Sequence, residues 1–258
     1  MVLKKTGVDA FFAHSKDDAA LRKDIQVFLE GIAQISSFGG KPRLRWKIIK
    51  EQDWRNSWKR FIKPRRVGAS FWVTPPWVEP PKFRRRQVIT IEPGMAFGTG
   101  THGTTRGCME CLELVADRLQ GGEFTGLDVG TGSGILAIAL AKLGARKIWA
   151  IDNDPVALTV ARENLRANGV ATRVHLSGTQ LNRIKKTFSV AVANLTAETI
   201  LELACALEKK VAQNGYMILS GILHKKSNAI TRCFAAKFNI VKRKRAREWV
   251  TLLLQRIE

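Results

Sequence analysis

The chain has 258 residues, and its hydrophobic content of 45% is enough for the core of one large domain, or of one medium and one small domain. It holds no run of about 18 uncharged apolar residues, and its first residues lack the apolar core of a signal peptide. We therefore expect a cytoplasmic protein with no membrane span. The formal net charge of +21 favours polyanionic partners such as ribosomal RNA, although a merely solvated basic face would give the same composition.

Residues 1–62 are predicted to form a small α/β domain. Residues 17–31 carry apolar side chains at helical spacing, and residues 43–50 alternate basic and apolar side chains at first, as a half-exposed strand would. Trp54, Trp58 and Phe61 then fall on one face of a predicted helix, a pattern typical of core packing. The first 50 residues contain no catalytic constellation, so we interpret this domain as a recognition module.

A linker is predicted over residues 63–85. A short strand at residues 67–73 precedes a stretch that four prolines stiffen, up to Pro81, and a basic run, Arg84–Arg86, follows. Residues 86–258 would then form the second domain.

The second domain opens with a strand at residues 88–91 and a loop at residues 92–105 that is dense in small and hydroxyl-bearing residues. A helix is predicted from about Thr104 to Arg118. Hydroxyl groups and free N–H groups at the start of a helix make a cradle for a polar ligand, whereas the same composition would also suit a flexible surface loop. His102 taken alone could be an ordinary capping histidine.

The cysteines give no sign of a metal site. Cys108 and Cys111 form a C-x-x-C pair on this helix, but no second pair or histidine stands at the spacing of a zinc site. A reduced, packed helix face is the better interpretation.

The strongest motif covers residues 127–152, which read as a strand, a glycine loop, an apolar helix and a second strand. The loop is built on three alternating glycines, Gly130, Gly132 and Gly134, which allow a sharp turn and a close approach of a ligand. The helix predicted at residues 135–143 follows at once, so its free N–H groups point at the loop. Asp152 stands 22 residues after Gly130, about the distance at which a Rossmann-type unit places a carboxylate on the ribose hydroxyls.

Two classes of ligand could use this geometry. Dinucleotide sites prefer the spacing G-x-G-x-x-G, because a pyrophosphate rests on the helix N-terminus. Here the spacing is G-x-G-x-G, and Asp128 stands two residues ahead of Gly130, where an acid would repel a pyrophosphate. The same acid suits the positively charged amino-acid end of S-adenosylmethionine, directly or through water. The motif therefore favours S-adenosylmethionine over a dinucleotide, and a glycine turn without a ligand is the remaining alternative.

Strands and helices alternate through the rest of the chain with short turns between them. Asp154 and Pro155 open a helix as N-cap and first-turn proline, and Gly169 ends it. Further strands are expected at residues 174–176, 188–193, 216–219 and 249–254, and a helix at residues 197–212. This alternation predicts a doubly wound, mostly parallel sheet. Ligands bind at the carboxyl ends of such strands, where the glycine loop, Asp152 and Asn194 fall.

Together these motifs resemble the PrmA family, bacterial methyltransferases that act on ribosomal protein L11. The resemblance covers most of the chain from about residue 51 to residue 257, and its most specific part is the loop Pro-Gly-Met-Ala-Phe-Gly-Thr-Gly-Thr-His at residues 93–102. It implies an α/β protein with a Rossmann-like class I methyltransferase domain at residues 86–258. A small ferredoxin-like substrate-recognition domain (residues 1–62) and a linker (residues 63–85) would precede it.

The resemblance also implies S-adenosylmethionine as the cofactor. In the family pattern Thr105 lies in the helix-start cradle, Asp152 on the ribose hydroxyls, and Asn194 at the end where the methyl group is transferred. Together, the residues that the resemblance carries over and those of the glycine motif and its neighbours give the candidates for cofactor binding: Phe97, Thr99, His102, Thr105, Asp128, Gly130, Gly132, Gly134, Asp152, Asn194 and Leu195. The first three belong to a loop that resembles a lid. Gly103 departs from the family, which usually has a proline there, and a glycine loosens this loop.

Members of the family transfer methyl groups to lysine side chains and to the α-amine of ribosomal protein L11. The reaction is an in-line displacement, so the main task of such an enzyme is to align a neutral amine with the methyl group. The side-chain carbonyl of Asn194 could steer that amine and makes this residue the catalytic candidate, although an asparagine can also simply end a strand. No dedicated general base is evident, and none is required.

Two alternatives stay open. A methyltransferase of the same fold could act on another protein or on RNA, or a basic ribosome-binding or RNA-binding protein could keep the fold without activity. Neither an Asn/Asp-Pro-Pro-Tyr loop nor a cysteine nucleophile is evident near the site. The intact glycine loop, Asp152 and Asn194 argue against an inactive protein.

Overall fold

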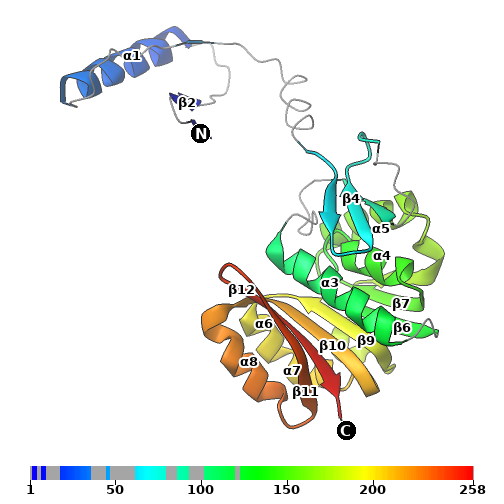
Figure 1. The fold of residues 1–258 in the computed structure, drawn as a ribbon. Helices are drawn as coiled ribbons and strands as arrows, with labels where there is room; N and C mark the ends of the chain where they lie inside the picture. Colours follow the sequence, from blue (N-terminus) through cyan, green and yellow to red (C-terminus); the bar gives the residue numbers. More distant parts are fainter. Residues whose placement is uncertain are drawn as a thin grey trace. The chain divides into compact units, whose positions relative to one another are not determined.

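The computed structural model describes residues 2–4, 7–9, 18–35, 45–46, 62–79, 86–92, 102–119 and 123–257. Contacts between residues divide the chain into two units, Met1–Lys59 and Arg60–Glu258 (Figure 1). In the described part of the first unit, two strands pair antiparallel and one helix follows: β1 (Val2–Lys4), β2 (Gly7–Asp9) and α1 (Asp18–Ile35). The helix predicted at residues 17–31 is confirmed.

Other predictions for the first unit lie wholly or largely outside the described residues. Only residues 45–46 of the strand predicted at residues 43–50 are described, and they have no regular secondary structure. The helix predicted around Trp54, Trp58 and Phe61 lies outside the described residues. The ferredoxin-like arrangement of this unit stays a prediction.

The second unit is built on a seven-stranded sheet in the order β11-β12-β10-β9-β6-β7-β8. Its strands are β6 (Phe124–Val129), β7 (Ala145–Ile151), β8 (Val174–Ser177), β9 (Phe188–Asn194), β10 (Val211–Leu223), β11 (Phe238–Ala246) and β12 (Trp249–Arg256). The strands from β10 to β8 run parallel, whereas β12 is antiparallel to both β10 and β11. The predicted doubly wound, mostly parallel sheet is confirmed.

Helices cover both faces of this sheet, as Figure 1 shows. One face carries α3 (Gly103–Arg118), α4 (Ile135–Lys142) and α5 (Pro155–Ala167). The other carries α6 (Ala197–Glu202), α7 (Ala204–Glu208) and α8 (Ser227–Phe234). Short 3-10 turns complete the unit: η2 (Ala171–Arg173), η3 (Leu181–Arg183) and η4 (His224–Lys226). Because side chains alternate along a strand, Val190 and Val192 face the first helix layer, and Ala191 and Ala193 face the second.

A smaller sheet packs on the first helix layer. It consists of β3 (Arg65–Val67), β4 (Phe71–Thr74) and β5 (Gln87–Thr90), with β3 antiparallel and β5 parallel to β4. The single strand predicted at residues 67–73 is wrong, because Gly68 adopts a φ of 57° and turns the chain into a hairpin. Val67 and Phe71 are fully buried in the same core as α3 and α4. Part of the predicted linker therefore belongs to the folded second unit, whereas the predicted domain boundaries stay a prediction.

The helix predicted at residues 197–212 is divided in the structure. It first ends at Glu202, restarts after Leu203 as α7, and gives way to β10 at Val211. Apolar side chains keep their helical spacing across the break, and Ala204 and Leu207 are buried like those before it. Periodicity alone could not locate this division.

Two further expectations concern α3 and membranes. Cys108 and Cys111 are buried free thiols on α3, which confirms the packed helix face. Among the residues that the structure describes, no helix is long and apolar enough to span a bilayer.

Candidate functional site

The glycine loop lies between the carboxyl end of β6 and the start of α4. Its three glycines have positive φ values, 71° at Gly130, 54° at Gly132 and 82° at Gly134. The backbone N–H groups of Gly130 and Thr131 both donate to the carbonyl of Ile151, at 2.9 and 3.0 Å. The loop is thus tied to the end of β7, as the predicted strand–loop–helix motif requires.

Asp128 is buried beneath this loop. Its Oδ2 accepts hydrogen bonds from the Thr131 hydroxyl at 2.6 Å and from the Ala137 N–H at 3.1 Å. Its Oδ1 is buried and has no hydrogen-bond partner among the described residues. Burial raises the pKa of the Asp128 carboxyl from 3.8 to about 7; the two hydrogen bonds lower it, and the nearby carboxylate of Asp152 raises it. A buried carboxylate oxygen without a donor is suited to a cationic ligand group.

Asp152 closes the neighbouring strand β7 and reaches back to the glycine loop. Its Oδ2 accepts the N–H of Gly132 at 2.8 Å, and its Oδ1 accepts the N–H of Asp154 at 3.1 Å. These two bonds fix the orientation of a half-buried carboxylate beside the loop. Each oxygen keeps a further lone pair that can accept a ligand hydroxyl.

Asn194 ends strand β9, which pairs with β6 directly beside Asp128. Its Nδ2 donates to the Thr105 hydroxyl on α3 at 3.5 Å, a long bond. Its Oδ1 is buried, and no described residue donates to it. Asn194 and Asp128 therefore both present a buried acceptor without a donor at the same edge of the sheet.

Leu195 connects the glycine loop to the end of β10. Its N–H donates to the Ser220 carbonyl at 3.1 Å. A Cβ atom at Gly130 would clash with the Leu195 side chain, and one at Gly221 would clash with the Leu195 carbonyl. Gly221 also has a φ of 81°, at an irregularity in the pairing of β10 with β12. The segment after Asn194 therefore fits only because Gly130 and Gly221 both lack a Cβ atom.

His102 caps α3. Its backbone is extended, its Nδ1 accepts the N–H of Thr104 at 3.4 Å, and its ring contacts Trp249 edge to face at a centroid distance of 5.4 Å. The structure therefore shows the capping role. Phe97 and Thr99, the other two residues predicted for the lid, lie outside the described residues.

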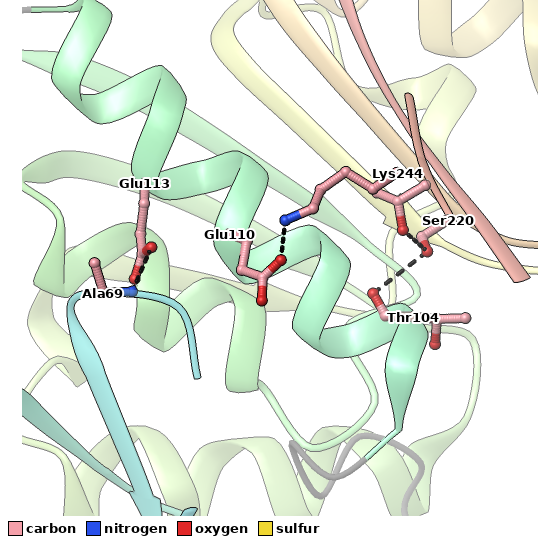
Figure 2. A network of polar contacts seen from close by, with 7 residues as sticks. Ala69, Thr104, Glu110, Glu113, Ser220 and Lys244 are labelled. Carbon is pink, nitrogen blue, oxygen red and sulfur yellow. Dashed lines mark hydrogen bonds and ion pairs between the residues drawn. The ribbon is translucent and has the colours of Figure 1, made fainter. Parts of the chain in front are cut away.

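Polar contacts lock α3 to its surroundings (Figure 2). At its start, the Thr104 carbonyl accepts the Ser220 hydroxyl at 3.3 Å. In its middle, Glu110 pairs with Lys244 of β11. Further on, the Glu113 carboxylate accepts the N–H of Ala69 at 2.9 Å in the turn between β3 and β4. These contacts fix the helix start that carries Thr105 relative to Asn194.

Sequence reasoning missed Asn164, which is 4% exposed in the middle of α5. Its Nδ2 donates to the Ser133 carbonyl in the glycine loop at 2.9 Å, and its Oδ1 accepts the N–H of Glu92 at 3.2 Å. Glu92 precedes the predicted lid segment, so one side chain joins the glycine loop to the start of that segment. The sequence feature that could have indicated this role is a pair of asparagines one turn apart on the helix. The second, Asn168, bonds both backbone groups of Thr90.

The structure thus brings together most of the predicted site residues at the carboxyl ends of β6, β7 and β9. This group, here called the strand-end site, consists of Thr105, Asp128, Gly130, Gly132, Gly134, Asp152, Asn194 and Leu195. Gly221 lies against Leu195 of this group, and Asn164 bonds to Ser133 in its glycine loop.

Comparison with known proteins points the same way. The family model described as "Ribosomal protein L11 methyltransferase (PrmA)" matches residues 1–257. A ribosomal protein L11 methyltransferase of Pelobacter propionicus is 39% identical over 251 residues, which are 96% of this chain and 81% of its own. One of Citrifermentans bemidjiense is 44% identical over 207 residues, 80% of this chain and 67% of its own.

A solved structure extends the likeness to three dimensions. The ribosomal protein L11 methylase of Lactobacillus delbrueckii subsp. bulgaricus has a TM-score of 0.68 and 34% identity, and the match covers 76% of this chain and 99% of that one. The agreement includes the Rossmann-like sheet that carries the strand-end site. This chain is therefore a methyltransferase that belongs to the PrmA family of ribosomal protein L11 methyltransferases.

Proposed function

We propose that this methyltransferase uses S-adenosylmethionine to methylate amino groups of ribosomal protein L11, on lysine side chains and at the N-terminus. The names of its relatives support that protein as the substrate. The observation that carries the proposal is the pair of buried acceptors without donors, Asp128 Oδ1 and Asn194 Oδ1, at the ends of adjacent parallel strands. Asp128 Oδ1 suits a cation, and Asn194 Oδ1 suits an amine N–H.

Asp128 and Asp152 are the residues that would hold the cofactor. The ammonium of its amino-acid end would supply the donor that Asp128 Oδ1 lacks, and its charge would favour the ionised carboxylate. Asp152 would accept the ribose hydroxyls with its remaining lone pairs. Phe97, Thr99 and His102, which the family pattern assigns to the cofactor, are the further candidates for binding this ligand.

Asn194 would orient the substrate amine. S-adenosylmethionine supplies an electrophilic methyl group and its own leaving group. A lysine amine, with an ordinary pKa of about 10.4, is protonated near neutrality, but burial in the site would lower that pKa and release the proton to water. Asn194 Oδ1 would then accept an N–H of the neutral amine, and this hydrogen bond would limit the directions that the nitrogen lone pair can take. Thr105, which accepts the Asn194 amide, would keep the carbonyl pointing at the amine.

Mass spectrometry of purified ribosomal protein L11 tests this function. After incubation with the enzyme and S-adenosylmethionine, we expect mass gains of whole methyl groups, located on amines by fragmentation. Asp152→Ala should abolish the gains, whereas Asp154→Ala, which removes a helix-capping carboxylate two residues away, should keep them. Cofactor binding without mass gain would refute the substrate, and the absence of cofactor binding in calorimetry would refute the cofactor.

We also propose that the basic surface of the chain contacts ribosomal RNA. The net charge of +21 supports this contact, because a field of that size attracts polyanions. Such a contact would bring the enzyme close to a substrate that is assembled with RNA.

A further inference from the structure

One crossover of the main sheet lacks the helix that the others have. The connections from β6 to β7, from β7 to β8 and from β9 to β10 all contain α-helices, but the connection from β8 to β9 contains only η3, three residues long. A right-handed crossover at this position would place its helix on the same face as α6 and α7. On that face, Trp149 of β7 and His175 of β8 are therefore left without a helix above them; Trp149 is half-buried and His175 is exposed.

A pocket of about 420 Å³ occupies this place. Its lining includes residues at or next to the start of β6, β7, β8 and β9 and continues along β7 to Trp149. It therefore lies toward the amino ends of the parallel strands, whereas Asp128 and Asn194 lie toward their carboxyl ends. We call it the β7–β8 groove. It shares no residue with the strand-end site.

The β7–β8 groove is strongly basic. Its cationic side chains are Arg146 and Lys147 of β7 and Lys186 just before β9; Arg173 of η2 also lines it, but its Nη1 donates to the Ala141 carbonyl of α4, on the other face of the sheet, at 2.9 Å. None of the described residues that line it is acidic. Arg146 pairs with Glu123 at 2.5 Å, but both side chains are about two-thirds exposed, and such a pair is weak enough to exchange for a phosphate.

The floor of the groove is aromatic. The rings of Trp149 and His175 lie 4.2 Å apart at an angle of 42°, and the Lys186 ammonium stands 5.3 Å from the centre of the indole. Thr172 and Thr187 add hydroxyl groups at the rim. Cations on two separate segments suit neighbouring phosphates of one strand better than a single anion, and accessible rings between them suit stacked bases.

We propose that the β7–β8 groove binds single-stranded RNA, with phosphates on Arg146, Lys147 and Lys186 and a base stacked on Trp149. An acidic peptide would use the cations but would gain little from the rings. The proposal rests on the RNA contact proposed above and gives that contact a location. It places RNA at the end of the sheet away from the methyl-transfer site, so the RNA would be held without being the substrate.

The test measures fluorescence anisotropy of a fluorescein-labelled single-stranded RNA of about 12 nucleotides with the full chain, over a range of salt. Lys147→Gln with Lys186→Gln should lower the salt slope of log K by about 1.4, which is roughly a 25-fold loss of affinity at 0.1 M salt. Trp149→Ala should lower affinity by about fivefold or more, and Trp149→Phe should restore most of it. The matched control is Arg232→Gln with Arg243→Gln. It removes one cation from α8 and one from β11, the outermost strand on the side of the sheet away from β8, and should change RNA affinity by less than about threefold.

Equal RNA affinity of the Lys147→Gln, Lys186→Gln variant and of the arginine control would overturn the proposal. So would full RNA affinity in Trp149→Ala, or equal competition by a poly-glutamate of the same charge, since either result would mean binding without bases. Methylation of isolated ribosomal protein L11 by the same variants is expected to stay unchanged. Loss of RNA binding with intact methylation would therefore support the groove, whereas absent methylation with the expected RNA result would refute only the proposed reaction.

Discussion

Replacing Asp128 by asparagine should stabilise the ligand-free protein at alkaline pH while weakening its hold on S-adenosylmethionine. Burial raises the pKa of this carboxyl from 3.8 to about 7 in the folded state. Between these two values the folded state keeps a proton that the unfolded state has lost. The free energy of unfolding therefore falls as the pH rises from about 4 to about 7. An asparagine cannot ionise and removes this dependence.

The magnitude follows from the two pKa values. Their difference, about 3, corresponds to roughly 4 kcal/mol of lost stability once the pH exceeds both values. Asparagine can still accept from the Thr131 hydroxyl and the Ala137 N–H with its carbonyl. Its amide nitrogen, however, would replace the oxygen that has no donor, and an unsatisfied buried amide costs about 1–3 kcal/mol. The variant should therefore be more stable than the wild type by about 1–3 kcal/mol at about pH 8.

Urea unfolding of both proteins at about pH 5 and about pH 8 provides the assay. The stability of Asp128→Asn minus that of the wild type should grow by about 2–3 kcal/mol between these conditions. In calorimetry, the variant should bind S-adenosylmethionine roughly 10- to 100-fold more weakly, because a charged hydrogen bond is lost. A stability difference that does not change with pH, or an unchanged affinity, would refute the assignment of Asp128 as the buried partner of the cofactor.

Three further substitutions probe the surroundings of the site. Asn164→Ala removes a buried side chain that donates to the Ser133 carbonyl and accepts the N–H of Glu92, so the melting temperature should fall by roughly 2–12 °C, and an unchanged melt would contradict this. Gly221→Ala forces a Cβ against the Leu195 carbonyl, so its methylation rate should fall well below that of Gly169→Ala, a position with a similar positive φ but open space around it. Equal methylation rates in the two variants would contradict this role of Gly221. Asn194→Ala should lower kcat for methylation by about tenfold or more and affect cofactor affinity much less, as measured by steady-state kinetics and calorimetry; an equal loss in both would assign it to cofactor binding alone.

The parts of the site that the sequence predicted are those set by short-range geometry. Alternating glycines followed by an apolar helix allow one backbone path, and Asp152 follows from the length of the intervening helix and strand. Once the strands are parallel, their carboxyl ends share an edge, so Asp128 and Asn194 had to be neighbours. No contact needed to be known beforehand.

The parts that were missed depend on partners distant in sequence. Asn164 looks like any polar residue of an amphipathic helix until β5 and the glycine loop are packed on α5. The turn at Gly68 closes on Glu113, 45 residues further along the chain, which the sequence could not reveal. The β7–β8 groove depends on the absence of a helix in one connection, which is a property of the assembled sheet.

The wedge that Leu195 forms between two glycines has an evolutionary consequence. Positions 130, 195 and 221 come from three separate strand ends, yet each limits the volume available to the others. A methyl group gained at position 130 or 221 would have to be matched by volume lost or displaced at position 195. Among descendants of this sequence the three positions should therefore change together or not at all. A drift in substrate preference that began at position 195 would therefore also change the glycine loop.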